Sequence, residues 1–287
     1  MTTDERVASS SSSSSSLYGS IVDVPWLAFA VPPVACSSCI PPTPGGRQVE
    51  YAIEAINNAG TCVGILASDG IVMASERRIT SGLLAPAKTS EKTYQLCSHA
   101  ACNVAGLTAD ANILIDQARL RAGRYLYQYQ EAIPVEQLVE YVCNYKQFYT
   151  QRGGLRPFGV SFLFAGYDEE HGFQLYQSDP SGNYSGWKAT VIGSNNQAGK
   201  SLLKSDYIAG EGTDDERIPN LQEALKLAVK VLNRTMDGTT TAAAVEKMEL
   251  FTLTVEDGKC VHHILKKEEA QQVIESVEAE AAPAGDA

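Results

Sequence analysis

Hydrophobic positions recur with two different periods along residues 48–265. In VEYAIEAI (49–56), apolar residues at i, i+3, i+4 and i+7 predict an amphipathic helix that stops at Asn57. Helical spacing also predicts helices over 109–129, 134–151, 194–207, 219–236 and 267–279. Runs rich in β-branched and aromatic residues predict strands over 61–67, 71–75, 93–98, 101–106, 159–167, 172–179, 187–193 and on both sides of Asp257-Gly258.

The order of these elements predicts the fold class. Runs of strands separated by pairs of helices are typical of antiparallel sheets with helices packed outside. We therefore expect an α+β fold, a four-layer αββα sandwich in which two sheets lie face to face. The stretch DPSGNYSG (179–186) has the chemistry of a hairpin turn. The predicted core includes Val63, Ile65, Val72, Val104, Phe162, Leu175 and Leu253.

The two ends of the chain differ in composition from the middle. Residues 1–46 hold eight consecutive serines (9–16) and a Pro/Cys segment, which predicts a disordered, low-complexity extension. Residues 47–275 are the predicted folded domain, and 276–287 a flexible acidic tail. The C-x-x-C pair Cys36 and Cys39 has no second ligand pair, so we interpret it as two incidental thiols.

Charge and motif content exclude several function classes. The formal net charge of −11 argues against general nucleic-acid binding, and no run of about 18 apolar residues predicts a membrane span. Seven irregularly spaced cysteines indicate reduced thiols. No phosphate loop, dinucleotide fingerprint, nucleophile elbow or zinc-protease motif is present. The sequence therefore predicts no cofactor and no metal site.

The dipeptide Gly60-Thr61 raises one catalytic possibility. A threonine freed by cleavage supplies a hydroxyl nucleophile and, through its own amine, the base. The alternative is that Thr61 only begins a strand. The helix predicted just before it is unlike a cleaved propeptide, which favours the strand.

Several separated motifs carry a family resemblance. GRQVEYAIEAI, AGTCVGI, SEKTY, RPFGV and LYQSDPSGNYSGWKAT resemble the α-type subunits of the eukaryotic proteasome core, in the order found there, over about residues 46–275. LYQSDPSGNYSGWKAT is most similar to one α type in particular. The resemblance implies the fold of N-terminal-nucleophile hydrolases and a non-catalytic structural and gating subunit. Its partners would be other α subunits in a seven-membered ring, β-ring subunits and a regulatory ATPase particle, acting in ubiquitin-dependent degradation in cytoplasm and nucleus.

The resemblance also assigns residues. The nucleophile of catalytic subunits matches Gly60, one place before Thr61, and their acid and lysine match Glu76 and Lys92. A one-residue shift turns a strand side chain to the other face. We therefore expect no catalytic residue here. An active threonine hydrolase using Thr61 and a free-standing binding protein of this fold are the alternatives.

In α-type subunits the lysine that matches Lys92 meets the C-terminal carboxylate of an activator's tail. The resemblance thus predicts that Lys92 binds such a tail, and a surface salt bridge with Glu91 is the alternative. The family also begins with a Tyr-Asp-containing gating segment, which residues 1–44 replace. A genuine variant extension and a mispredicted first exon both explain this; the second is preferred, because the Pro-interrupted apolar stretch has no evident packing partner.

Overall fold

A computed structural model describes residues 44–78, 83, 90, 92–207, 218–236, 247–256 and 258–281 of the chain. The predicted extension lies outside the described residues except for its last three positions, as do Cys36, Cys39 and everything after Ala281. The boundaries proposed for the two ends therefore stay predictions. The first helix begins at Pro44, before residue 47, where the folded domain was predicted to start.

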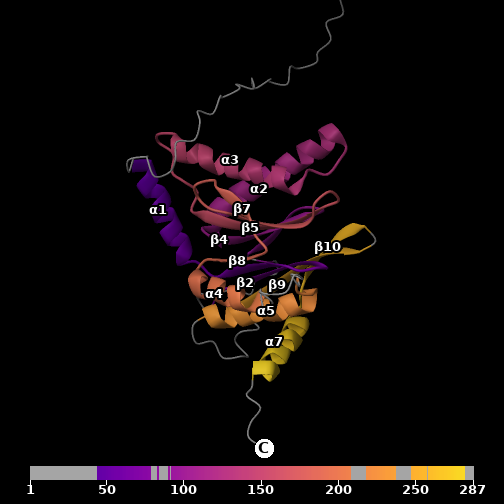
Figure 1. Ribbon diagram of the computed structural model, residues 1–287. Coiled ribbons are helices and arrows are strands. Elements are labelled where there is room, and N and C mark those ends of the chain that lie inside the picture. Colours follow the sequence, from indigo (N-terminus) through magenta and orange to yellow (C-terminus); the bar gives the residue numbers. More distant parts are fainter. Residues whose placement is uncertain are drawn as a thin grey trace, which may run out of the picture. The chain divides into compact units, whose positions relative to one another are not determined.

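Two five-stranded antiparallel sheets form the centre of the domain (Figure 1). The first sheet has the order β10-β9-β2-β1-β8 and comprises β1 (Cys62–Leu66), β2 (Gly70–Glu76), β8 (Ala189–Ile192), β9 (Met248–Glu256) and β10 (Lys259–Ile264). The second has the order β3-β4-β5-β6-β7 and comprises β3 (Thr93–Cys97), β4 (Ala100–Gly106), β5 (Val160–Asp168), β6 (Gly172–Ser178) and β7 (Tyr184–Gly186).

Helices cover the outer face of each sheet (Figure 1). The helices of the described part of the chain are α1 (Pro44–Asn57), α2 (Thr108–Tyr129), α3 (Val135–Gln151), α4 (Asn196–Tyr207), α5 (Leu221–Thr235) and α7 (Lys267–Ala281), and α1 lies beside the sheets, at the left of Figure 1. Helices α2 and α3 pack on the second sheet, α4 and α5 pack on the first, and α7 packs on α5. The predicted α+β sandwich with four αββα layers is confirmed.

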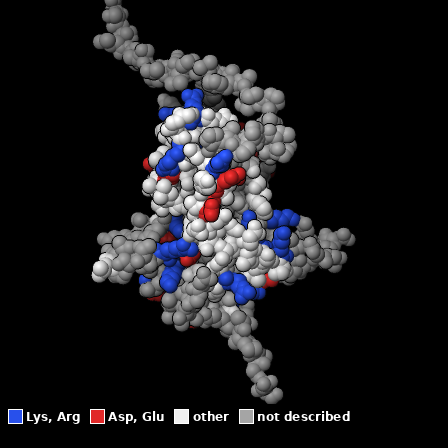
Figure 2. All heavy atoms as spheres, turned by 90° about the vertical axis from the view of Figure 1, so that its left-hand side faces the viewer, with Lys and Arg blue, Asp and Glu red and all other residues white. Residues whose placement is uncertain are grey.

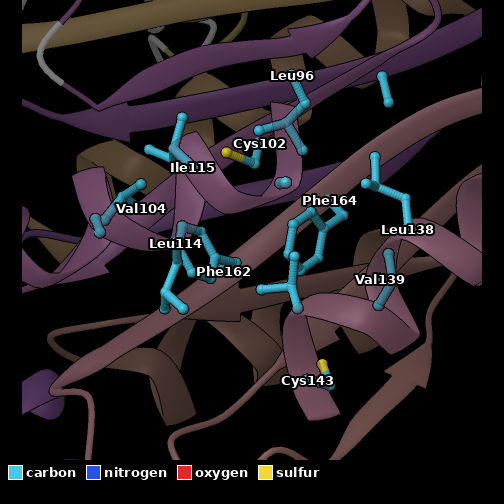
Figure 3. Close-up of a cluster of buried hydrophobic side chains, with 14 of the residues drawn as sticks. Leu96, Cys102, Val104, Leu114, Ile115, Leu138, Val139, Cys143, Phe162 and Phe164 are labelled. Atoms are coloured by element: carbon cyan, nitrogen blue, oxygen red, sulfur yellow. The ribbon is translucent and has the colours of Figure 1, made fainter. Parts of the chain in front are cut away.

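Three hydrophobic clusters hold the layers together, one beneath each helix layer and one between the sheets. Figure 3 shows the cluster under α2 and α3, where Leu114 of α2 lies beside Phe162 of β5 and Ile115 of α2 lies beside Cys102 of β4. All seven residues of the predicted core are buried. They were correctly identified because alternating apolar positions in a doubly covered sheet all face a packed layer.

The segment 179–186 differs from its prediction as a single turn. Asp179 closes the turn early: its Oδ1 accepts from the Ser181 amide (2.9 Å), and its own amide donates to Asn183 O (3.1 Å). Tyr184–Gly186 then forms strand β7, which pairs with β6. The next strand, β8, crosses to the other sheet and pairs with β1. The stretch therefore forms a hairpin turn, as its composition indicated, but the hairpin joins β6 to β7, and the strand expected over 187–193 pairs with β1 instead.

Helix length and the distribution of basic side chains bear on possible membrane and nucleic-acid contacts. Among the described helices, none is both long and apolar enough to span a membrane. On the face shown in Figure 2, Lys and Arg side chains lie in separate groups rather than in one continuous basic patch. Binding to nucleic acid generally relies on such a patch.

Candidate functional site around Gly60

Thr61 lies fully buried where the chain enters β1 from α1. Its backbone N–H donates to Glu76 Oε2 (3.0 Å), and its hydroxyl donates to Ser194 O (2.9 Å). In this chain, with Gly60 before it, the nitrogen is a peptide amide, and the hydroxyl is both hydrogen-bonded and buried. Thr61 begins the strand, as the register predicted, and the arrangement cannot activate it as a nucleophile.

Gly60 occupies the position that the resemblance assigns to a nucleophile, and a side chain there would require the Lys92 ammonium to move. A Cβ on Gly60 would overlap Lys92 Nζ and would lie 3.0 Å from Glu76 O and 3.4 Å from Glu76 Oε2. From the other side, Gly193 (φ +94°) brings its backbone so close that its own Cβ would lie 2.7 Å from Gly60 O. The side chains of Lys92 and Glu76 thus lie against a residue, Gly60, that has no side chain of its own.

Glu76 connects three segments of backbone at the end of β2. Its Oε2 accepts from the Thr61 amide, and its Oε1 accepts from Arg78 Nε (3.2 Å). Arg78 Nη1 donates to Asn58 O (2.7 Å). This carboxylate therefore fixes the connection between α1 and β1, a structural role in place of the acid–base role it would have beside a free threonine.

Lys92 is half-buried just before β3. Its Nζ donates to Gly60 O (2.9 Å) and lies 4.0 Å from Cys62 Sγ. An ammonium has three donors, and within the described residues one oxygen accepts from this one. Glu91, the alternative salt-bridge partner, lies outside the described residues. The geometry therefore leaves donor capacity on Lys92 for a further acceptor.

Cys62 is the thiol nearest the site, and burial makes it unreactive. Desolvation raises the pKa of the Cys62 thiol, which the nearby Lys92 ammonium only partly opposes. The thiolate is the nucleophilic form of cysteine, and a raised pKa suppresses it. Within the described ranges, no group of three or more His, Cys, Asp or Glu side chains could hold a metal ion.

Sequence patterns had singled out Gly60, Thr61, Glu76 and Lys92, and the structure brings these four together. They had not indicated Ser194, Gly193 or Asn58, which contact the site only through backbone atoms. A backbone contact carries no side-chain signature, so no pattern could have identified these residues. The four histidines take no part in the hydrogen bonds around Gly60 that are described above.

Comparison with known proteins agrees with this geometry. The family model described as "Proteasome subunit" matches residues 56–249. Proteasome subunit alpha type-4-1 of Oryza sativa subsp. indica is 56% identical over 218 residues, covering 75% of this chain and 83% of that protein. Alpha type-4-A of Arabidopsis thaliana and alpha type-4 of Spinacia oleracea are each 52% identical over 235 residues, covering 81% of this chain and 90% of those proteins.

The α type that residues 175–190 resemble is this same alpha type-4. The match also spans the whole site, from Thr61 through Glu76 and Lys92 to the strands that follow. The absence of a side chain at Gly60 and the burial of Thr61 agree with α-type rather than catalytic subunits. On its sequence, its fold and the geometry at Gly60, the chain belongs to the proteasome subunit family.

Proposed function

We propose that the chain is a structural and gating subunit of the α ring of the proteasome core particle, acting in ubiquitin-dependent protein degradation in cytoplasm and nucleus. It is not itself a catalytic subunit. The observation that carries the proposal is the Gly60 site, where a glycine stands at the position of the nucleophile and the side chains of Lys92 and Glu76 lie against its backbone. The gating part rests on the family resemblance, since the residues before Pro44 lie outside the described chain.

Assembly into a ring is supported by the outer face of α2. Large apolar side chains are exposed on and just before this helix: Leu107, Ile113, Leu120, Leu126, Tyr127 and Tyr129. Exposed apolar side chains gathered on one element mark surfaces that other proteins cover. Neighbouring α subunits and the β ring are the partners that we assign to this subunit's outer surfaces.

Native mass spectrometry of the complex purified from its source tests this assignment. A ring subunit is expected in a particle of several hundred kilodaltons that also contains other proteasome subunits. Recovery of the chain only as a monomer would instead support a free-standing binding protein. Loss of the first 60 residues from the intact mass would support the alternative of a processed threonine hydrolase.

Substitution of Thr61 by alanine is expected to leave every peptidase activity of the assembled particle unchanged. The side chain makes one hydrogen bond, to Ser194 O, so the change should lower the free energy of unfolding of the subunit by about 1 kcal/mol. Fluorogenic peptides specific for each activity provide the measurement. A selective loss of one activity, in particles of normal composition, would show that Thr61 acts in catalysis.

We further propose that Lys92 receives the C-terminal carboxylate of an activator's tail. The unused donor capacity of its half-buried ammonium suits this role, because a point positive charge captures a terminal carboxylate. The carbonyl of Gly60 holds the ammonium in place from the inner side. The proposal applies to a regulatory ATPase particle that docks on the α ring.

Lys92→Glu is expected to weaken binding of the activator by at least about tenfold, since it replaces an attraction by a repulsion between like charges. Activator titration followed by peptide hydrolysis gives the affinity, and Lys92→Gln provides a neutral variant. Lys259→Glu, at an exposed position on β10, is the matched charge reversal that should leave affinity unchanged.

Truncation of the activator tail should not add to the effect of Lys92→Glu, because both changes remove one contact. Core-particle assembly should remain normal in the Lys92→Glu, Lys92→Gln and Lys259→Glu variants. Unchanged activator affinity in particles with Lys92→Glu would exclude Lys92 as the tail receptor.

A further inference from the structure

Buried side-chain atoms of five residues lack a hydrogen-bond partner in the part of the chain that the structure describes: one guanidinium nitrogen of Arg121, one ring nitrogen of His262, and the polar groups of three residues that are themselves buried. These three residues are Ser75 on β2, Thr93 on β3 and Asn103 on β4. Ser75 and Asn103 are fully buried, and Thr93 is 6% exposed. Both side-chain polar atoms of Asn103, Nδ2 and Oδ1, are without a partner, as are the hydroxyls of Ser75 and Thr93.

Strand register places the side chains of Ser75, Thr93 and Asn103 on the sheet faces that are turned toward each other. Thr93 pairs directly with Asn103 in the antiparallel β3–β4 ladder, so their side chains share one face. Asn103 alternates with Ala101 and Ala105, which belong to the cluster between the sheets. Ser75 lies on the same face of β2 as Ile71 and Met73 of that cluster.

The two sheets approach each other closely at this end. Cys62 lies directly opposite Ser75 in the β1–β2 ladder. Its Sγ is 3.3 Å from Val104 O, next to Asn103 on the opposite sheet. The three polar side chains therefore surround one region, with Ser75 on one side and Thr93 and Asn103 on the other.

Burial of these groups without partners would be costly. An unsatisfied buried polar group destabilises a protein by roughly 1–3 kcal/mol, and native structures rarely retain one without an ordered water or ion. Two ionic side chains lie close by, and each has a partner elsewhere: Lys92 donates to Gly60 O, and Glu249, opposite Ser75 in the β2–β9 ladder, accepts from Ser90 Oγ (2.6 Å). Three such side chains in one region of a tightly packed layer therefore indicate a ligand that can both donate and accept.

We propose that Ser75, Thr93 and Asn103 form an internal water-binding site between the sheets. Water is the ligand whose chemistry fits: it donates twice and accepts twice, and buried waters in proteins typically make about three hydrogen bonds. The carboxamide of Asn103 can donate and accept at once, and each hydroxyl can do either. This site does not depend on activator docking, and nothing at Lys92 is required for it.

A structure of the assembled particle at a resolution that shows ordered water tests the site directly. We expect solvent density within hydrogen-bond distance of the Asn103 carboxamide and of at least one of the two hydroxyls. Direct hydrogen bonds among the three side chains, or no density between them, would overturn the proposal.

The sign of a stability change gives an independent test. Leucine has the branched shape of asparagine without its polar atoms, so Asn103→Leu displaces the water and leaves two hydroxyls unsatisfied. The midpoint of denaturant unfolding of the full-length chain is then expected to fall. If the region is dry, the same substitution removes an unsatisfied carboxamide, and the midpoint should rise, which would overturn the proposal.

A triple variant separates this effect from poor packing. Asn103→Leu combined with Ser75→Ala and Thr93→Val removes every polar group of the site, and it should recover most of the midpoint lost in the single variant. Leu163→Met, at the residue paired with Asn103 on β5, reports the effect of an apolar exchange in the same layer. A midpoint that falls further in the triple variant would assign the loss to packing and contradict the water site.

Discussion

Substitution of Gly182 by alanine is expected to lower the free energy of unfolding by about 3 kcal/mol or more, because two penalties add. Gly182 has φ +88°, a backbone conformation that strains any residue with a side chain. Its Cβ would also lie 2.6 Å from Cys143 O and 2.7 Å from Gln147 Cβ, both on α3. Because one of these atoms belongs to the helix backbone, no rotamer change can relieve the overlap.

Gly172→Ala is the matched control for this prediction. Gly172 has φ +69°, but a Cβ there would meet nothing within 4 Å. Backbone strain acts alone at this position, so we expect a loss of about 1 kcal/mol. Denaturant unfolding of both variants provides the comparison. Equal losses in the two variants would show that contact with α3 contributes nothing at Gly182.

Lys146 is expected to make stability depend on pH in the alkaline range. Its side chain is fully buried under α3, where Nζ donates to Ser178 Oγ (2.9 Å) and Val160 O (3.1 Å) and lies 4.7 Å from the Phe162 ring centroid. Burial lowers the pKa of Lys146 from 10.5 to about 8, although the field of neighbouring Cys143 and Asp179 opposes the shift.

The direction of the pH effect on stability follows from the number of protons that the folded and the unfolded chain bind. Between pH 8 and 10.5 the unfolded chain holds this proton and the folded chain has lost it, so stability rises with pH in that window. This gain in the free energy of unfolding is complete above pH 10.5 and is lost as the pH falls to 8. The shift corresponds to about 3 kcal/mol across the window.

Lys146→Met removes this titration and should abolish the difference. The measurement is denaturant unfolding of the full-length chain at intervals from pH 7 to 10.5, taken as wild type minus variant, so that other titrating groups cancel. Lys259→Met, at an exposed position, should leave the wild-type profile unchanged. A wild-type curve parallel to that of Lys146→Met would show that the pKa of Lys146 is not lowered by burial.

The spacing of apolar residues in the sequence was sufficient to predict which segments are helices and which are strands, and their order was sufficient to predict the fold class. Amphipathic repeats defined α2, α3 and α5, because a helix that covers a sheet must present one apolar stripe. Apolar runs defined β1, β2 and β5, since these strands are buried on both faces. Family motifs added the four residues of the site and the register that separates Gly60 from Thr61.

Only the tertiary structure decided how strands and side chains far apart in the chain meet. The crossing of β8 to the first sheet depends on the early closure of the turn at Asp179, which residue types in DPSGNYSG do not reveal. No pattern in the sequence had led to a prediction for Lys146 of α3. The structure buries it, because carbonyl oxygens of β5 and of the turn after β6, and a hydroxyl of β6, accept hydrogen bonds from its ammonium.

The chain by itself thus determined which residues are apolar, which segments are helices or strands in most of the domain, and which backbone position lacks the threonine of a catalytic subunit. The tertiary structure determined that Lys92 and Glu76 lie against the backbone of Gly60 and that Ser75, Thr93 and Asn103 converge between the sheets. The physical reason is that local sequence controls backbone conformation and the period of burial. Contacts between sheets depend on register and layer packing, which involve the whole domain at once.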